Sequence, residues 1–416
     1  MTIFAYHDQE LFCEQVALNQ LVQEFGTPLY VYSSKALTDN YLHYKNNFSS
    51  LNPMICYAVK ANGNLSILKH FADLGAGFDI VSGGELARVL AAGGKAEQII
   101  FSGVGKTVAE MEFALQNNIF CFNVESVNEL HRLNTVALKM GKKAPISLRV
   151  NPDVDAKTHP YISTGLKENK FGIPFEDALS TYLQAQQLPG LEIIGVDCHV
   201  GSQLLDAAPL IEACEKLLNL VEQLQDKNIQ LKHIDMGGGI GIQYEQNDPA
   251  PSLSDYAEAL ASKLENYNLE LILEPGRSLV GNTGVLLTNV EYIKKNQDKN
   301  FIIVDAAMND LARPALYDAF HEIIPVKLDS SASSLTADIV GPICESSDFL
   351  GKNRTLTTTE GEVLAIKDTG AYGTSMASNY NARPRGAEVL VDGKNYHLIR
   401  SRETLSQLIE NEKCCL

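Results

Sequence analysis

A lysine directly follows an apolar run near the start of the chain. The stretch "CYAVKANGN" (56–64) ends its buried-looking part at Lys60 and continues with small and polar residues. A lysine in this position is commonly a solvated residue at the edge of a sheet. The alternative is an amine removed from water by burial, which can attack a carbonyl carbon. The choice between the two depends on which residues the fold brings beside Lys60.

Composition excludes several classes of partner. The 416-residue chain has 51 acidic and 34 basic residues, a net charge of −17. Such a surface repels nucleic-acid phosphates and anionic lipid, so we expect neither nucleic acid nor membrane as a partner. No apolar run is long enough to span a membrane, and the first residues lack the basic region of a signal peptide. The eight cysteines form no C-x-x-C pair and no zinc spacing, which predicts reduced thiols in a cytoplasmic protein.

Short apolar, β-branched runs recur along the first two-thirds of the chain, and a helix-like stretch follows each of them except the last. The eight runs are residues 54–60, 78–82, 99–104, 119–124, 146–151, 193–201, 233–239 and 269–277. Buried strands that alternate with helices predict a parallel sheet covered on its outside. Eight such units match a (β/α)8 barrel, the TIM-type α/β fold. A doubly wound sheet is the rival architecture, but no G-x-G-x-x-G follows the first strand.

The pattern changes after residue 280. Several strand-like runs follow, and Asp392-Gly393 separates two of them as in a β-hairpin. We therefore expect a barrel over residues 30–280 and a second, mostly antiparallel β domain over residues 281–416. Residues 1–29 are assigned to this second domain because they do not fit the barrel period.

In a barrel of this kind the chemistry lies at the carboxyl ends of the strands. The residues expected at these ends are mostly polar or glycine: Lys60, Ser82, Ser102, Asn123, Arg149, His199, Gly237, Gly238, Gly239 and the stretch from Glu274 to Arg277. A strong cation, an imidazole, a triple glycine and a carboxylate thus share one mouth. This placement favours a functional role for Lys60.

The stretch "MGGGIG" (236–241) suits a phosphate group that approaches backbone amides, although a flexible turn would use the same glycines. A phosphate anchor and a reactive lysine together suit pyridoxal phosphate, whose aldehyde condenses with an amine. Glu274 is placed to hold the ring nitrogen protonated, unless it only pairs with Arg277. His199 is either a core histidine or a flat ring stacked on the cofactor. The mouth lacks the clustered Asp and His ligands of metallohydrolases, so we expect no metal.

The motifs resemble those of a known family, the alanine-racemase-like (fold type III) pyridoxal phosphate-dependent decarboxylases of basic amino acids, over almost the full length of the chain. The matching motifs are "YAVKAN", "HVGSQ", "DMGGG", "EPGR", "GPICESSD" and "GAYG". The resemblance implies that Lys60 holds the cofactor covalently, that His199 stacks on its ring and that Cys344 donates a proton. The further cofactor-binding residues that it implies are Ser202, Gly237, Gly238, Gly239, Glu274, Gly276, Arg277 and Tyr372.

Within this family the chain looks like the members that decarboxylate meso-2,6-diaminopimelate to L-lysine and CO2, the last step of lysine biosynthesis. This substrate carries a second amino-acid head, whereas ornithine carries only a distal ammonium. Arginine binds carboxylate through two hydrogen bonds, and a glutamate suits an ammonium. The residues expected at the distal head are Arg277, Arg313, Tyr317, Glu345 and Tyr372. The alternative for Arg313 is a surface salt bridge.

The resemblance also implies a homodimer with composite active sites, to which the neighbouring subunit contributes Cys344, Glu345 and Tyr372. Three other functions remain open. A decarboxylase of ornithine or arginine would use the same cofactor. A racemase of this fold would carry an arginine at the ring nitrogen, which Glu274 argues against. A non-catalytic carrier of pyridoxal phosphate would resemble the barrel alone, which the long second domain argues against.

Overall fold

The computed structural model describes residues 3–155, 170–245, 247–297, 299–329 and 333–412. The chain forms two compact units. One, here called the β unit, consists of Met1–Asp39, Tyr244–Asp248 and Leu279–Leu416, and the other, here called the barrel unit, consists of Asn40–Gln243 and Pro249–Ser278. The chain therefore passes from one unit to the other beside Asp39 and Ser278, near the expected positions 30 and 280.

Eight parallel strands form a closed ring in the barrel unit. They are β5 (Met54–Ala58), β6 (Gly77–Ile80), β7 (Ile99–Phe101), β8 (Cys121–Val124), β9 (Ala144–Asn151), β11 (Leu191–Asp197), β12 (His233–Asp235) and β13 (Glu270–Leu273). Each strand pairs with the next, and β13 returns to pair with β5, which closes the barrel. A short strand, β10 (Ile173–Pro174), adds to the end of β9. The predicted (β/α)8 barrel is confirmed, and the doubly wound alternative is wrong because the ring has no open edge.

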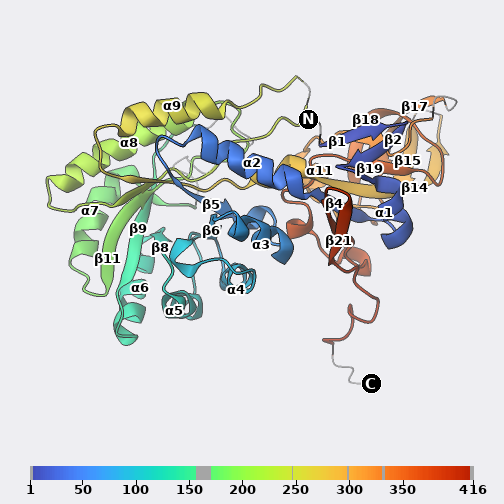
Figure 1. Ribbon diagram of the computed structural model, residues 1–416. Helices are drawn as coiled ribbons and strands as arrows, with labels where there is room; N and C mark the ends of the chain where they lie inside the picture. Colours follow the sequence, from blue (N-terminus) through green and yellow to red (C-terminus); the bar gives the residue numbers. More distant parts are fainter. Residues whose placement is uncertain (1–2, 156–169, 246, 298, 330–332, 413–416) are drawn as a thin grey trace. The chain divides into compact units, whose positions relative to one another are not determined.

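Helices follow these strands and cover the barrel, as Figure 1 shows for α6 to α9 around β9 and β11. They are α3 (Leu65–Asp73), α4 (Gly83–Ala91), α5 (Val108–Asn117), α6 (Val127–Lys139), α7 (Phe175–Gln186), α8 (Ala208–Gln225) and α9 (Leu253–Leu264). The side chains of Ser82, Thr107 and Ser126 cap α4, α5 and α6 by accepting a hydrogen bond from a backbone amide of the first turn. These caps start each helix shortly after a strand end, and they give Ser82 a structural task there.

The β unit is built around one long strand, β14 (Gly284–Lys295), which pairs antiparallel with β4 (Leu29–Ser33), β15 (Asn300–Val304) and β19 (Val363–Ile366). The sheet is completed by β16 (Ile323–Pro325), β17 (Ser334–Val340), β18 (Phe349–Thr357), β20 (Ala387–Asp392) and β21 (Asn395–Arg400). Two pairs, β15–β17 and β20–β4, are parallel and the rest are antiparallel. The mostly antiparallel domain and its Asp392-Gly393 hairpin are confirmed, with Gly393 at φ +61° in the turn.

The remaining elements are short. Near the start, β1 (Phe4–His7), β2 (Glu10–Cys13) and β3 (Val16–Ala17) form a small sheet followed by α1 (Leu18–Phe25). Helix α2 (Ser34–Asn47) leads from the β unit into the barrel unit, α10 (Arg277–Val280) leads back, and α11 (Arg313–Tyr317) lies in the β unit. Within the described part of the chain, no helix has the length and apolar character needed to cross a bilayer.

Candidate active site

Lys60 lies in a single helical turn, Val59–Ala61, directly after β5. Its amine forms an ion pair with Asp79 of β6, a carboxylate that is itself fully buried, and 34% of the Lys60 side chain is exposed. A Cβ added to Gly276 would lie 3.1 Å from the Cβ of Ala58, so the "EPGR" segment passes close to this turn. Lys60 is therefore neither a solvated edge residue nor fully removed from water. It lies at the barrel mouth against a buried acid.

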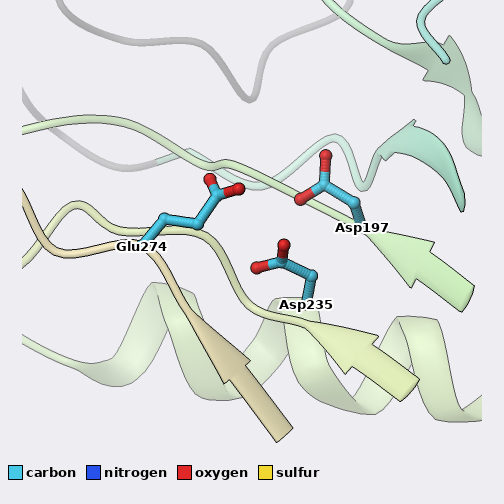
Figure 2. A group of neighbouring side chains, drawn as sticks. All are labelled: Asp197, Asp235 and Glu274. Atoms are coloured by element: carbon cyan, nitrogen blue, oxygen red, sulfur yellow. The ribbon is translucent and has the colours of Figure 1, made fainter. Parts of the chain in front are cut away.

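Three buried carboxyl groups meet near this turn. Asp197 ends β11, Asp235 ends β12 and Glu274 follows β13, and one oxygen from each lies within 4.8 Å of the others. Figure 2 shows the three side chains pointing toward one another from three neighbouring strands. The expectation that the mouth lacks clustered Asp and His ligands is therefore wrong for its carboxyl groups, and the expected absence of a metal stays a prediction. The three acids come from three separate stretches of the sequence, and only closure of the barrel brings them together.

Burial raises the pKa of all three acids. It raises the pKa of Asp235 to about 6, and the pKa values of Glu274 and Asp197 rise well above their usual range, with the neighbouring carboxylates adding to the effect of burial. Glu274 Oε1 and Asp235 Oδ2 meet no hydrogen-bond donor among the described residues. A proton held on one carboxyl group and donated to a neighbouring one removes a negative charge from the cluster. Three ionised groups would instead repel one another.

The surroundings of Glu274 show whether the expected cofactor fits the site. Glu274 lies three residues before Arg277 in the sequence, and the ion pair given as its alternative role stays a prediction. Its Oε1 is a buried acceptor that meets no donor among the residues that the structure describes. A protonated pyridine nitrogen is a donor of the kind that this oxygen lacks. The residues present therefore fit pyridoxal phosphate.

His199 follows β11 and is half-buried. The backbone N–H of Gly238 donates to His199 Nδ1 over 3.2 Å, so the proton of the neutral ring is on Nε2. Burial, together with the positive charges of Arg149 and Lys60, lowers the pKa of His199 well below its usual value. A neutral, flat ring is suited to stacking on a cofactor, and it does not act as an imidazolium acid at neutral pH.

The triple glycine has structural reasons of its own. Gly237 and Gly239 have φ values of +62° and +112°, and a Cβ on Gly238 would lie 2.2 Å from the carbonyl oxygen of Glu274. The Gly237 amide donates to Asp235 Oδ1 over 2.9 Å, as the Gly238 amide does to His199. Glycine is thus required here by the approach of the neighbouring strands, whether or not a phosphate binds. The phosphate role of these residues stays a prediction.

Two arginines complete the mouth. Arg277 Nη2 donates to Ser202 Oγ over 3.1 Å, which brings together two residues expected to bind the cofactor. Arg149 is buried and pairs with Glu125 over 3.0 Å, and that carboxylate also accepts the amide of Gly103. Sequence reasoning placed Arg149 at the mouth but gave it no role, and it missed Asp79, Asp197 and Asp235. The signal for all four was a single charged residue inside an otherwise apolar run.

The other predicted site residues lie in the β unit. Arg313, at the start of α11, is buried, which does not fit a surface salt bridge, and Tyr317 ends the same helix. Cys344 and Glu345 are exposed in the loop between β17 and β18, where Asn381 Oδ1 accepts the amide of Cys344 over 2.9 Å. The half-buried Tyr372 has φ +57°. The catalytic and binding roles given to these residues stay predictions.

Comparison with known proteins identifies the family. A family described as "Pyridoxal-dependent decarboxylase, pyridoxal binding domain" matches residues 35–281. The chain is 63% identical over 406 residues to the diaminopimelate decarboxylase of Neisseria meningitidis serogroup B, and the match covers 98% of both chains. The chain belongs to the diaminopimelate decarboxylase family. Members of this family are pyridoxal phosphate-dependent amino-acid decarboxylases, and so is this chain.

Solved structures of the family have the same fold. The diaminopimelate decarboxylase from Helicobacter pylori complexed with L-lysine is 46% identical, with a TM-score of 0.92 over 95% of this chain and 99% of that one. The enzyme from M. jannaschii in complex with L-lysine is 40% identical, with a TM-score of 0.94 over 99% and 98% of the two chains. The similarity to these enzymes covers both the barrel unit and the β unit, so the hypothesis of a carrier that resembles the barrel alone is wrong.

Proposed function

We propose that this protein converts meso-2,6-diaminopimelate into L-lysine and CO2. The observation that carries the proposal is the 63% identity to a diaminopimelate decarboxylase over 98% of both chains. The geometry of the barrel mouth supports it, because an amine beside a buried acid and an unpaired buried carboxyl oxygen lie at adjacent strand ends. In this reaction one carbon–carbon bond breaks, the carboxylate leaves as CO2, and a proton replaces it on the same carbon.

Pyridoxal phosphate, when bound, supplies an aldehyde that links to an amine and a ring that accepts the electron pair left by CO2. Lys60 would hold the aldehyde, and Glu274 would keep a proton at the ring nitrogen. His199 would lie flat against the ring, and Ser202, the triple glycine Gly237 to Gly239, Gly276, Arg277 and Tyr372 would hold the rest of the cofactor. The neutral state of His199 agrees with its role, and a proton on the ring nitrogen would supply the donor that the buried Glu274 Oε1 lacks among the described residues.

The distal head of the substrate carries both charges of an amino acid. Arg277 and Arg313 offer guanidinium groups to its carboxylate, and Glu345 offers a carboxylate to its ammonium. Tyr317 and Tyr372 are the remaining residues assigned to substrate binding. The proton that replaces the carboxylate comes from Cys344 or from the amine of Lys60, and the thiol of Cys344 is exposed and free.

The protein would act as a homodimer in the cytoplasm, with Cys344, Glu345 and Tyr372 of one subunit serving the site of the other. The exposure of Cys344 and Glu345 supports this part of the proposal. Mixing two variants tests it: Lys60→Ala and Cys344→Ala subunits are each expected to be impaired alone. Refolded together, they form mixed dimers with one intact site and recover activity. No recovery would show that both residues serve the site of a single subunit.

The substrate is tested by turnover of meso-diaminopimelate, ornithine, arginine and lysine at equal concentration with pyridoxal phosphate present, measured as CO2 and identified amine product. Sites built to hydrogen-bond a specific polar group reject analogues that lack it by about 10⁴-fold. We expect turnover of meso-diaminopimelate alone at that level of preference. Equal use of ornithine or arginine would assign the protein to the decarboxylases of those amino acids.

A further inference from the structure

Arg313 is held on two sides by residues with no role in the proposal above. Its Nη1 lies 2.8 Å from Nε2 of His321, a fully buried residue. The ring of Tyr244 lies against the guanidinium group, with 4.6 Å between the guanidinium carbon and the ring centroid. The Tyr244 and His321 rings meet edge to face at 5.4 Å. All three residues belong to the β unit.

The contacts of His321 determine its protonation state. Its Nδ1 lies 2.8 Å from the backbone carbonyl oxygen of Lys367. A carbonyl oxygen only accepts and a guanidinium only donates. Nδ1 must therefore carry a proton toward Lys367, and Nε2 must be the bare acceptor for Arg313. Only the neutral ring protonated at Nδ1 satisfies both contacts at once.

We propose that His321 is a positioning residue that orients the Arg313 guanidinium for the distal carboxylate of the substrate, with Tyr244 covering one face of the group. The proposal rests on the proposed function, in which Arg313 binds that carboxylate. Binding through two parallel hydrogen bonds requires a fixed guanidinium plane. A free arginine loses side-chain rotamer freedom when it is ordered, and a side chain already held by His321 and Tyr244 loses less of it on binding.

His321 has a second contact that could be merely structural, the bond to the Lys367 carbonyl. Two substitutions separate the contacts. His321→Asn places an amide N–H where Nδ1 was and removes the acceptor for Arg313. His321→Gln places an amide oxygen where Nε2 was and retains an acceptor for Arg313 while it loses the bond to Lys367.

The experiment measures KM and kcat for meso-diaminopimelate with the holoenzyme of each variant. A hydrogen bond to a charged group contributes enough that its loss corresponds to about a 10-fold or larger change. We expect His321→Asn to raise KM by about 10-fold with a smaller change in kcat, and His321→Gln to recover most of that loss. A KM unchanged in His321→Asn, or raised equally in both variants, would overturn the proposal.

Tyr244 provides an independent test if His321→Asn does not fold. Tyr244→Leu removes the ring from the face of Arg313, whereas Tyr244→Phe keeps the ring and removes only the hydroxyl. We expect KM to rise in Tyr244→Leu and to be restored in Tyr244→Phe, and equal KM values in these two variants would count against the proposal. Absence of meso-diaminopimelate turnover by the wild-type protein would instead refute the proposed function, which keeps the two failures distinct.

Discussion

The barrel mouth and the loop that carries Cys344 differ in how far their functional side chains are buried and contact one another. At the mouth, Lys60 pairs with a buried acid, His199 accepts a backbone amide, and Glu274 lies in a cluster of buried carboxyl groups. Cys344 and Glu345 are exposed, and the Glu345 carboxylate accepts a hydrogen bond from the Tyr380 hydroxyl over 3.4 Å. Burial and mutual contact thus set the charge states of the side chains at the mouth before a substrate binds. The loop residues have no comparable environment within the described part of the chain.

The largest effect that tests this difference is expected at Lys60. Lys60→Ala removes the amine that would hold the cofactor, and loss of a residue that acts covalently lowers kcat by roughly 10³-fold or more. Borohydride reduction of the wild-type holoenzyme followed by peptide mapping should leave the pyridoxyl group on the peptide that contains Lys60. The internal control is Lys106, a buried lysine of the barrel unit that pairs with Glu129. A label on Lys106 would show that the wrong lysine has been assigned.

Glu274 should give the next largest effect. Glu274→Gln keeps the size of the side chain and removes its charge, and loss of one interaction that stabilises developing charge lowers kcat by about 10²–10³-fold. We expect cofactor absorbance to remain while turnover falls. The matched control is Glu270→Gln on the same strand, an exposed acid outside the carboxyl cluster. Near-normal turnover of Glu274→Gln would remove Glu274 from the chemistry.

A smaller and different effect is expected at Arg313, because its assigned role is binding and not chemistry. Arg313→Leu should raise KM for meso-diaminopimelate by about 10–100-fold, since a hydrogen bond to a charged group contributes roughly 1.5–3 kcal/mol. The dissociation constant of pyridoxal phosphate, measured by titration of its absorbance, should change much less. A parallel loss of cofactor affinity would indicate that Arg313 supports the fold of the β unit and does not bind the substrate.

The smallest effect concerns stability and involves the carboxyl cluster. The folded protein raises the pKa of Asp235 from the ordinary 3.8 to about 6, so between these values the folded state binds more protons than the unfolded state. The free energy of unfolding should therefore fall as the pH rises from about 4 to 6, by a few kcal/mol at most. Asp235→Asn carries no titrating group there and keeps an oxygen for the Gly237 amide.

Urea unfolding of the cofactor-free protein at several pH values between 4.5 and 7.5 measures this effect. The wild-type free energy should decrease with pH more steeply than that of Asp235→Asn. Identical slopes for the two proteins would show that Asp235 titrates normally and that the cluster does not hold a shared proton.

The parts of the fold that were predicted are those with a strong local pattern. Strands such as β5 and β7 are continuous apolar runs followed by helices, so periodicity located them, and the Asp392-Gly393 turn was located by its distinctive sequence. Strand β18 was not predicted, because exposed polar and charged residues interrupt its sequence and its pairing with β17 holds it in the sheet. His321 was also missed, since no motif surrounds it and its importance comes from a contact with Arg313.

The sequence by itself determined which residue types stand at the carboxyl ends of the barrel strands, because alternation of buried strands and helices places them there. Lys60, His199 and Glu274 were found in this way. Only the tertiary structure decided their protonation and that of their neighbours. The pKa of Glu274, the tautomer of His199 and that of His321 depend on burial and on atoms a few ångströms away in space. These partners come from strands and loops far apart in the chain, and spacing in the sequence does not encode the distances between them.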